Sequence, residues 1–149
     1  MLDQVDTFFN VSSGRLKLRE LGPDHGELIC YDRPDIAGPR SSNYSIFKTD
    51  QPAVLRELLA AALGVRGIVR KRRKLYFVGQ TRVHIDEVVG LGAYLELEVV
   101  PSPGQSREEG EAIAGEIMRQ LEIQVGDLVE GAYIDLLAAT GGACGKLER

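Results

Sequence analysis

Hydrophobic and polar residues alternate along several short segments of the first hundred residues, and this alternation predicts β-strands. In RLKLRE the two leucines, Leu16 and Leu18, fall on one face and the charged residues on the other. Turn residues at 22–26 make the following segment its hairpin partner. We expect strands over Arg15–Glu20, Glu27–Arg33, Gly67–Val78, Arg82–Val89 and Ala93–Val100, the last three as an antiparallel meander, and a short apolar segment at Tyr44–Phe47.

Helical spacing replaces this alternation in two places. Pro52 suits the first turn of a helix whose leucines recur at helical spacing until Gly64. A second helix is predicted to begin at Ser106, which can form a capping box with Glu109. Residues 126–139 favour a short third helix, and residues 141–149 are expected to form a flexible tail. Because no domain boundary is visible, residues 1–140 are predicted to form one domain of the α+β class.

Composition narrows the class of protein. The chain of 149 residues is 44% hydrophobic and 27% charged, which is ordinary for a globular domain. Its apolar stretches are too short to cross a membrane, and its first residues lack the layout of a signal peptide. Two distant cysteines show no metal-ligand spacing. We therefore expect a cytoplasmic protein without a membrane partner.

The charges are unevenly distributed along the chain. The net charge is −4, yet residues 1–85 hold 14 of the 18 Lys and Arg, and residues 86–149 hold 13 of the 22 Asp and Glu. A basic half predicts an anionic partner, which is nucleic acid, a phosphorylated small molecule or an acidic protein surface. Glutamates on the same sheet would repel a nucleic-acid backbone, so we expect no nucleic-acid partner.

Polar residues repeat at every second position on strands that should be neighbours, so each group projects to one face of its strand. The groups are Lys17 with Arg19, Tyr31 with Arg33, Lys71 with Arg73, Arg82 with His84 and Asp86, and Glu96 with Glu98. Two arrangements fit this pattern. Either the sheet has a highly charged outer surface, or these faces converge inside a closed or nearly closed barrel whose apolar outer faces are covered by helices.

The barrel alternative has a chemical consequence. Unpaired buried charges are costly, so an interior lined by about six cations would have to hold anions. A polyphosphate fits, because Arg and Lys match phosphoryl oxygens. Glu96 and Glu98 are suitable ligands for Mg²⁺ or Mn²⁺, which bridge to phosphate. Within RKRRK, Lys71 and Arg73 lie on the opposite face from their neighbours, and one of the two sets is expected to be solvated.

These residues lie in stretches that resemble the CYTH family, also called triphosphate tunnel metalloenzymes and named for class IV adenylyl cyclases and thiamine triphosphatases. The stretches are DTFFNVSSGRLKLRE, ELICYDRP, SSNYSIF, VRKRRKLY, VHIDEVVGLGAYLELE and GAYIDLL, in family order. The block from His84 to Glu98 most resembles the cyclase branch. The resemblance implies an antiparallel β-tunnel, here an incomplete barrel with a polar interior and outer helices.

Carried over by position, the resemblance also implies the site residues. The implied triphosphate ligands are Lys17, Arg19, Arg33, Lys71, Arg73 and Arg82. Glu96 and Glu98 are implied as metal ligands, and Asp86 as an inward acid that holds a second metal or orients a phosphate ligand. We interpret His84 as a structural or solvent-facing histidine. No residue is assigned to catalysis.

One feature departs from the family pattern. The family's first strand bears Glu-x-Glu-x-Lys, and nothing like it precedes QVDTFF, where the only acids are Asp3 and Asp6. We therefore expect a truncated chain that lacks this strand and the helix after it. Such a sheet would keep two unpaired edges and half of the metal carboxylates. The edges could be filled by a second copy, which predicts a homodimer.

The resemblance leaves three activities open. A cyclase converts ATP into cyclic AMP and pyrophosphate, a triphosphatase removes the terminal phosphate of inorganic or thiamine triphosphate, and a binding protein turns nothing over. We expect a small-molecule triphosphate as the partner, which is ATP, thiamine triphosphate or tripolyphosphate. We expect Mg²⁺ or Mn²⁺ as the cofactor and cyclase-like chemistry as the first alternative.

Overall fold

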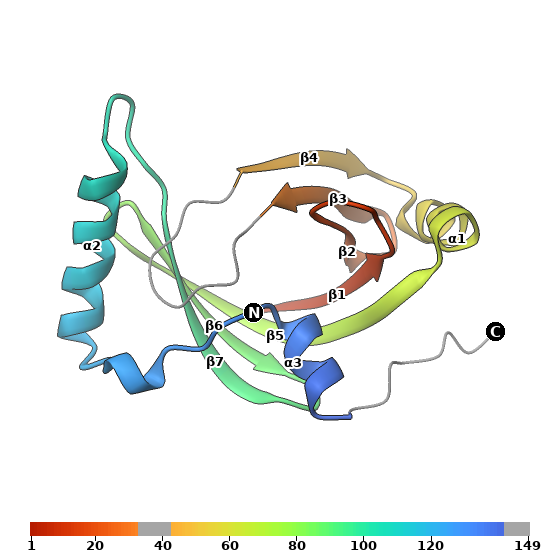
Figure 1. Cartoon of the computed structure of the whole chain (residues 1–149). Helices are drawn as coiled ribbons and strands as arrows, with labels where there is room; N and C mark the ends of the chain where they lie inside the picture. The colour runs from red at the N-terminus through yellow and green to blue at the C-terminus, as the bar shows by residue number, and fades with distance from the viewer. Residues whose placement is uncertain (33–42, 142–149) are drawn as a thin grey trace.

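The computed structural model describes residues 1–32 and 43–141, which form a curved antiparallel sheet and three α-helices (Figure 1). The strands are β1 (Leu2–Phe9), β2 (Arg15–Gly22), β3 (His25–Asp32), β4 (Asn43–Thr49), β5 (Val65–Val78), β6 (Thr81–Val88) and β7 (Gly92–Val99). Their order is β4-β3-β2-β1-β5-β6-β7. The sheet is not closed, since within the described residues β4 and β7 each have a strand on one side only. The predicted α+β class and incomplete barrel are confirmed, and the homodimer stays a prediction.

Strand β1 is the central strand of the sheet, and the alternation pattern did not predict it. It pairs with β2 on one side and with β5 on the other, so it joins the two halves of the sheet. Residues 6–9 are all buried, and their sequence, Asp-Thr-Phe-Phe, shows no alternation of polar and apolar residues. The strand gave no alternation signal because both of its faces are buried here, which removes the contrast between a solvent-exposed face and a core face.

Helices α1 (Pro52–Leu63) and α2 (Arg107–Gln120) begin where the sequence predicted. Helix α1 ends at Gly64, whose φ of 76° favours glycine, and it packs against β1, β2 and β3. In α2 the Glu109 backbone N–H donates to Ser106 Oγ at 3.2 Å, and the Ser106 N–H donates to Glu109 Oε2 at 2.7 Å. Helix α2 packs against β7.

The third predicted helix is shorter than expected. A 3-10 turn (Val125–Asp127) precedes α3 (Tyr133–Ala139). Ile134 of α3 is buried against Phe8, Val69 and Val88. Helix α3 therefore covers one end of the sheet face that carries Lys71 and Arg73, rather than the opposite face.

Strand register assigns the charged side chains to a common face. Asp6 lies opposite Arg19, Arg73 opposite Asp86, and Arg82 opposite Glu98. We call this concave side the inner face and the opposite side the outer face. The structure thus brings the alternating polar groups of β2, β5, β6 and β7 together.

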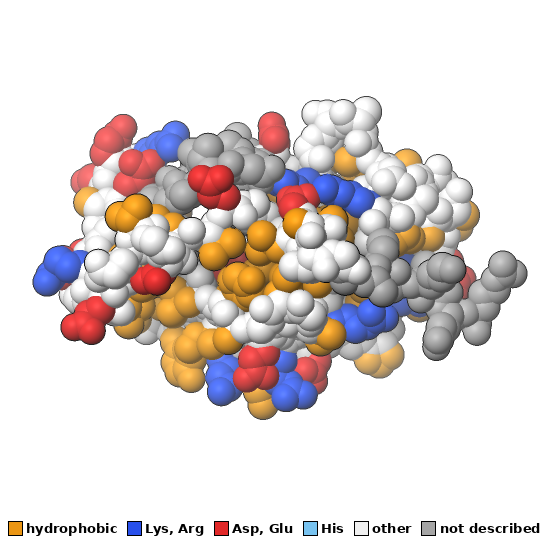
Figure 2. Space-filling model, turned by 60° about the horizontal axis from the view of Figure 1, so that its bottom comes forward, with side chains coloured by type: hydrophobic (Ala, Val, Ile, Leu, Met, Phe, Trp, Pro, Cys, Tyr) orange, Lys and Arg blue, Asp and Glu red, His pale blue; other side chains and the backbone are white. Residues whose placement is uncertain are grey.

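The outer face carries the remaining side chains of the same strands. It holds the exposed Arg70, Arg72 and Lys74, so these are the solvated set within RKRRK. Leu18 and Val83 are buried on this face as expected, but Ile85 and Leu95 remain exposed. The expectation that helices cover the whole outer face was wrong, because α1 and α2 reach only its ends. Figure 2 shows exposed hydrophobic side chains between charged ones on one side of the molecule.

Part of the sequence predictions lies outside the described residues. This applies to Arg33, to most of the predicted loop at 34–43 and to residues 142–149 of the tail. Among the described helices, none combines the length and apolar character needed to cross a bilayer.

Candidate functional site

The first cationic group on the inner face joins β1 and β2, and we call it the Asp6 cluster (Asp6, Lys17 and Arg19). Lys17 Nζ donates to Asp6 Oδ2 at 2.7 Å. Arg19 donates from Nε to Asp6 Oδ1 at 2.9 Å and from Nη2 to Asp6 Oδ2 at 3.0 Å. The Asp6 side chain is buried. Sequence reasoning noted Asp6 only as an isolated acid, because the strand that aims it inward was not predicted.

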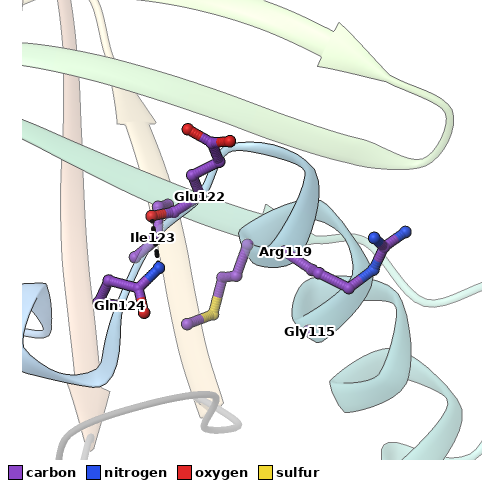
Figure 3. Close-up of a pocket in the computed structure, with 6 residues that line it drawn as sticks. Gly115, Arg119, Glu122, Ile123 and Gln124 are labelled. Atoms are coloured by element: carbon purple, nitrogen blue, oxygen red, sulfur yellow. Dashed lines mark hydrogen bonds between the residues drawn. The ribbon is translucent and has the colours of Figure 1, made fainter.

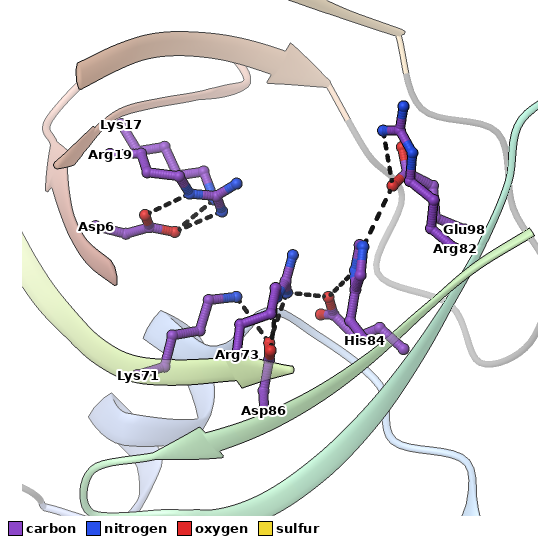
Figure 4. A network of polar contacts seen from close by, with 10 residues as sticks. Asp6, Lys17, Arg19, Lys71, Arg73, Arg82, His84, Asp86 and Glu98 are labelled. Atoms are coloured by element: carbon purple, nitrogen blue, oxygen red, sulfur yellow. Dashed lines mark hydrogen bonds and ion pairs between the residues drawn. The ribbon is translucent and has the colours of Figure 1, made fainter. Parts of the chain in front are cut away.

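The Asp86 cluster (Asp86, Lys71 and Arg73) repeats this arrangement across β5 and β6 (Figure 4). Lys71 Nζ donates to Asp86 Oδ2 at 2.8 Å, and Arg73 Nε and Nη2 each donate to one Asp86 oxygen at 2.6 Å. In both clusters the aspartate lies directly opposite the arginine, and the lysine precedes that arginine by two residues. All three members of the Asp86 cluster are buried.

These aspartates correct the expectation about charge. The sequence predicted cations whose charge only a bound anion could balance, but each cluster contains a carboxylate that balances one of its two cations. The Asp6 cluster therefore keeps one positive charge in excess, whereas Arg73 of the Asp86 cluster also contacts Glu96. Both Asp86 oxygens already accept hydrogen bonds from cations, which supports its implied role in orienting phosphate ligands over a role as a metal ligand.

Burial and neighbouring charges shift the pKa values in both clusters. Burial raises the pKa of Asp6, but Lys17 and Arg19 outweigh burial and hold this pKa well below its usual range. Burial lowers the pKa of Lys17 from 10.5 to about 8, and the charge of Asp6 opposes that shift. Burial also lowers the pKa of Lys71. The lysines are therefore the cations of the site that high pH neutralises first.

A third group extends the network towards the turn between β5 and β6 (Figure 4). Arg73 Nη2 donates to Glu96 Oε2 at 2.7 Å. His84 lies between the two glutamates, with Nδ1 3.7 Å from Glu96 Oε2 and Nε2 3.6 Å from Glu98 Oε2. Glu98 also lies 3.5 Å from Arg82 Nη1. His84 is buried, so its solvent-facing alternative was wrong.

The carboxylates of Glu96 and Glu98 fit a divalent cation whose remaining ligands come from the substrate and water. Both side chains are 36% exposed and lie on the inner face of β7. Within residues 1–32 and 43–141 no three His, Cys, Asp or Glu side chains converge as a metal-binding group. Mg²⁺ is commonly bound by one or two carboxylates together with substrate phosphates and water, and these two glutamates supply that number.

Helix α3 adds a further residue that sequence reasoning missed. The Tyr133 ring lies 5.0 Å from Lys71 Nζ and packs edge-on against Tyr94 at 5.2 Å. Burial and the charges of Glu96 and Asp86 raise the pKa of Tyr133. Tyr133 stands in the matching stretch GAYIDLL, but nothing in its spacing shows that it reaches the inner face.

A pocket beside the C-terminal part of α2 contains none of the predicted site residues (Figure 3). Its lining residues are Gly115, Met118, Arg119, Glu122, Ile123 and Gln124. Arg119 is engaged by Glu116, with Nη2 2.6 Å from Glu116 Oε1. A triphosphate requires several converging cations, so we place the candidate site on the inner face.

Comparison with known proteins shows the family of this chain. A sequence model of the CYTH domain matches residues 2–133. The chain belongs to the CYTH family. This family includes adenylyl cyclases and triphosphatases, binds triphosphate substrates and is metal-dependent. No curated protein matches the sequence.

Solved structures share the CYTH fold. The PH1012 protein from Pyrococcus horikoshii OT3 is 25% identical with a TM-score of 0.81, over 91% of this chain and 82% of that one. A conserved hypothetical protein from Pyrococcus furiosus is 19% identical with a TM-score of 0.77, over 91% and 82% of the two chains. A "putative adenylate cyclase" from Vibrio parahaemolyticus is 17% identical with a TM-score of 0.74, over 92% and 80%.

Proposed function

We propose that the inner face binds a linear triphosphate together with a divalent cation, and that the chain converts ATP into cyclic AMP and pyrophosphate. The observation that carries the proposal is the pair of matching clusters on one face, which together hold two lysines and two arginines around two aspartates. Family membership supports the substrate class, and the resemblance of the block from His84 to Glu98 to the cyclase branch supports the reaction.

In this proposal the clusters act by preorganisation. Asp6 and Asp86 hold the cations in fixed positions, so little reorganisation is needed when phosphoryl charge arrives. Arg19 and Arg73 use two nitrogens each on their aspartates, which leaves Nη1 of each without such a bond. The ribose 3′-oxygen bonds to the α-phosphorus as its hydroxyl proton passes to water, the bond from that phosphorus to the bridging oxygen breaks, and pyrophosphate leaves.

The proposed metal ligands are Glu96 and Glu98, with Mg²⁺ or Mn²⁺ as the cation. When bound, the cation would neutralise phosphate charge and polarise the phosphorus that is attacked. Arg73 pairs with Glu96 and Arg82 with Glu98, so each proposed metal ligand has a neighbouring cation. Asp86 orients Lys71 and Arg73 in this proposal.

Product analysis tests the reaction. The protein is incubated with Mg²⁺ and ATP, and separately with tripolyphosphate and thiamine triphosphate, and the products are separated by ion-exchange chromatography. Cyclic AMP with pyrophosphate is expected. Orthophosphate would instead indicate a triphosphatase, and binding without any product would indicate a triphosphate-binding protein.

The Glu96→Gln variant is expected to lose the divalent-metal dependence of triphosphate binding. The substitution keeps the size of the side chain and removes a carboxylate that supplies a metal ligand. Calorimetric titration of tripolyphosphate with and without Mg²⁺ measures this dependence. Glu87→Gln on the exposed outer face is the control and should keep it. An unchanged Mg²⁺ effect in Glu96→Gln would contradict the assignment.

Triphosphate affinity is expected to fall as the pH rises through about 8, the pKa of Lys17 in the folded protein. Above this pKa Lys17 is mostly neutral. Binding of the anion then requires Lys17 to take up a proton, and this protonation costs binding free energy. The affinity should therefore fall by up to about tenfold per pH unit above pH 8.

The Lys17→Arg variant tests this origin, because arginine keeps its charge throughout the range. Tripolyphosphate is titrated into both proteins between pH 7 and 10. The ligand ionises in the same way in both series, so the ratio of the two affinities at each pH reports on Lys17 alone. Parallel pH profiles for the two proteins would exclude Lys17 as the titrating group.

A further inference from the structure

We infer that Leu75 and Phe77 form a subsite for the aromatic base of a nucleoside triphosphate, at the end of the inner face that α3 leaves uncovered. We call these two side chains the Leu75–Phe77 ledge. The inference rests on the proposed triphosphate binding and deepens it, since it selects a nucleotide over an inorganic triphosphate.

The strand register places the ledge in line with the cations. The ladder between β5 and β6 is regular from Lys71 to Val78, so alternate residues of β5 share one face. Leu75 and Phe77 therefore lie on the same face as Lys71 and Arg73. Leu75 pairs with His84, and Phe77 pairs with Arg82. The ledge thus continues the polar network without a change of face.

The two ends of the inner face differ in what covers them. Ile134 and Tyr133 of α3 pack over the end that contains Phe8, Val69 and Val88, which leaves little room there for an organic group. At the other end Phe77 is 69% exposed and Leu75 is 38% exposed. Exposed apolar side chains beside a cationic site mark a place for an apolar part of a ligand.

The chemistry of the ledge fits a nucleotide base. Bases stack on aromatic side chains whatever their sequence identity, and arginine adds cation–π attraction. Arg82 lies directly across the strand pair from Phe77. Phe77 lies four positions after Arg73 on β5, which corresponds to about 13 Å along the strand. This spacing accommodates a pentose between the phosphates at Arg73 and a base at Phe77.

The ledge also orients the substrate. On β6, His84 lies between Asp86 and Arg82, and on β7 Glu96 pairs with His84 and Glu98 with Arg82, so both carboxylates stand on the side of the ledge. A base on Phe77 directs the α-phosphate towards Glu96 and Glu98, and the terminal phosphate towards the clusters. Attack at the α-phosphorus, as in the cyclase reaction, needs this orientation.

The experiment compares two ligands on the same variants. Isothermal titration calorimetry measures an ATP analogue with a methylene group between the α- and β-phosphorus, which prevents turnover, and tripolyphosphate, both with Mg²⁺. The proteins are wild type, Phe77→Ala, Phe77→Tyr and Tyr76→Ala. Tyr76 is the neighbouring aromatic residue, is 52% exposed and lies on the outer face, so it is a matched control.

The expected result is selective. Phe77→Ala should weaken the affinity for the nucleotide analogue by about 5- to 100-fold and leave the affinity for tripolyphosphate within about twofold of wild type. Phe77→Tyr and Tyr76→Ala should bind both ligands like wild type. Equal effects of Phe77→Ala on both ligands, or no effect on the nucleotide, would overturn the ledge while leaving triphosphate binding intact. Failure of wild type to bind either ligand would overturn the proposed function and the ledge with it.

Discussion

Replacing Arg73 with alanine is expected to weaken triphosphate binding by about 10- to 100-fold, since a hydrogen bond between charged groups contributes about 1.5–3 kcal/mol. Arg73 is the cation that connects most of the site, because its guanidinium contacts both Asp86 and Glu96. Its pKa is raised by these carboxylates despite burial, so it stays charged at any working pH. Titration calorimetry with tripolyphosphate in the presence of Mg²⁺ measures the effect.

The adjacent Arg72 provides a matched control on the same strand. Arg72 points to the outer face, is exposed and forms a 3.2 Å ion pair with the exposed Asp3. Arg72→Ala removes the same charge from the chain, so it reproduces any effect of net charge alone. If Arg72→Ala weakens binding as much as Arg73→Ala, the inner face is not the binding site. Arg73→Lys should recover only part of the affinity, because lysine lacks the planar fork.

The Asp6→Asn variant is expected to lose about 3–5 kcal/mol of stability, the typical cost of removing one partner from a buried ion pair. Asp6 is the only carboxylate among the side chains described here that hydrogen-bonds to Lys17 or Arg19, and the substitution leaves both cations unbalanced. Urea-induced unfolding measures the loss. Asp3→Asn is the control, because Asp3 is exposed and its surface ion pair contributes at most about 1 kcal/mol.

Two further readouts identify the cause of this loss. The pKa of Asp6 is depressed in the folded protein, so its contribution is present above its unfolded pKa of about 3.8 and is lost as the pH falls through the folded pKa. Tripolyphosphate should stabilise Asp6→Asn more than wild type, since the anion balances the freed cations. An Asp6→Asn protein as stable as Asp3→Asn would show that the Asp6 cluster contributes little to folding.

Strands β2, β6 and β7 were predictable because polar and apolar residues alternate along each of them. In RKRRK the two-residue repeat separates Lys71 and Arg73 from the three solvated cations, and the structure agrees with that separation. Helix α1 was equally predictable, since Pro52 and Gly64 act locally on backbone conformation. Signals of this kind depend only on neighbours in the sequence.

The partners of these cations could not be predicted in the same way. Asp6 lies 11 residues from Lys17 and Asp86 lies 15 residues from Lys71, and each pair depends on strand register. Register is set by burial and turn geometry across strands, which a repeat within one strand does not contain. The solvent-facing alternative for His84 was wrong for the same reason, because its two glutamates belong to the next strand.

The sequence by itself determined which side chains of each strand share a face, where α1 and α2 begin, and which family the matching stretches resemble. Only the tertiary structure decided that β1 stands between β2 and β5 and so places two cation pairs with their own aspartates on one concave face. The physical reason is that alternation records burial along a single strand, whereas the order and curvature of strands follow from contacts between distant segments.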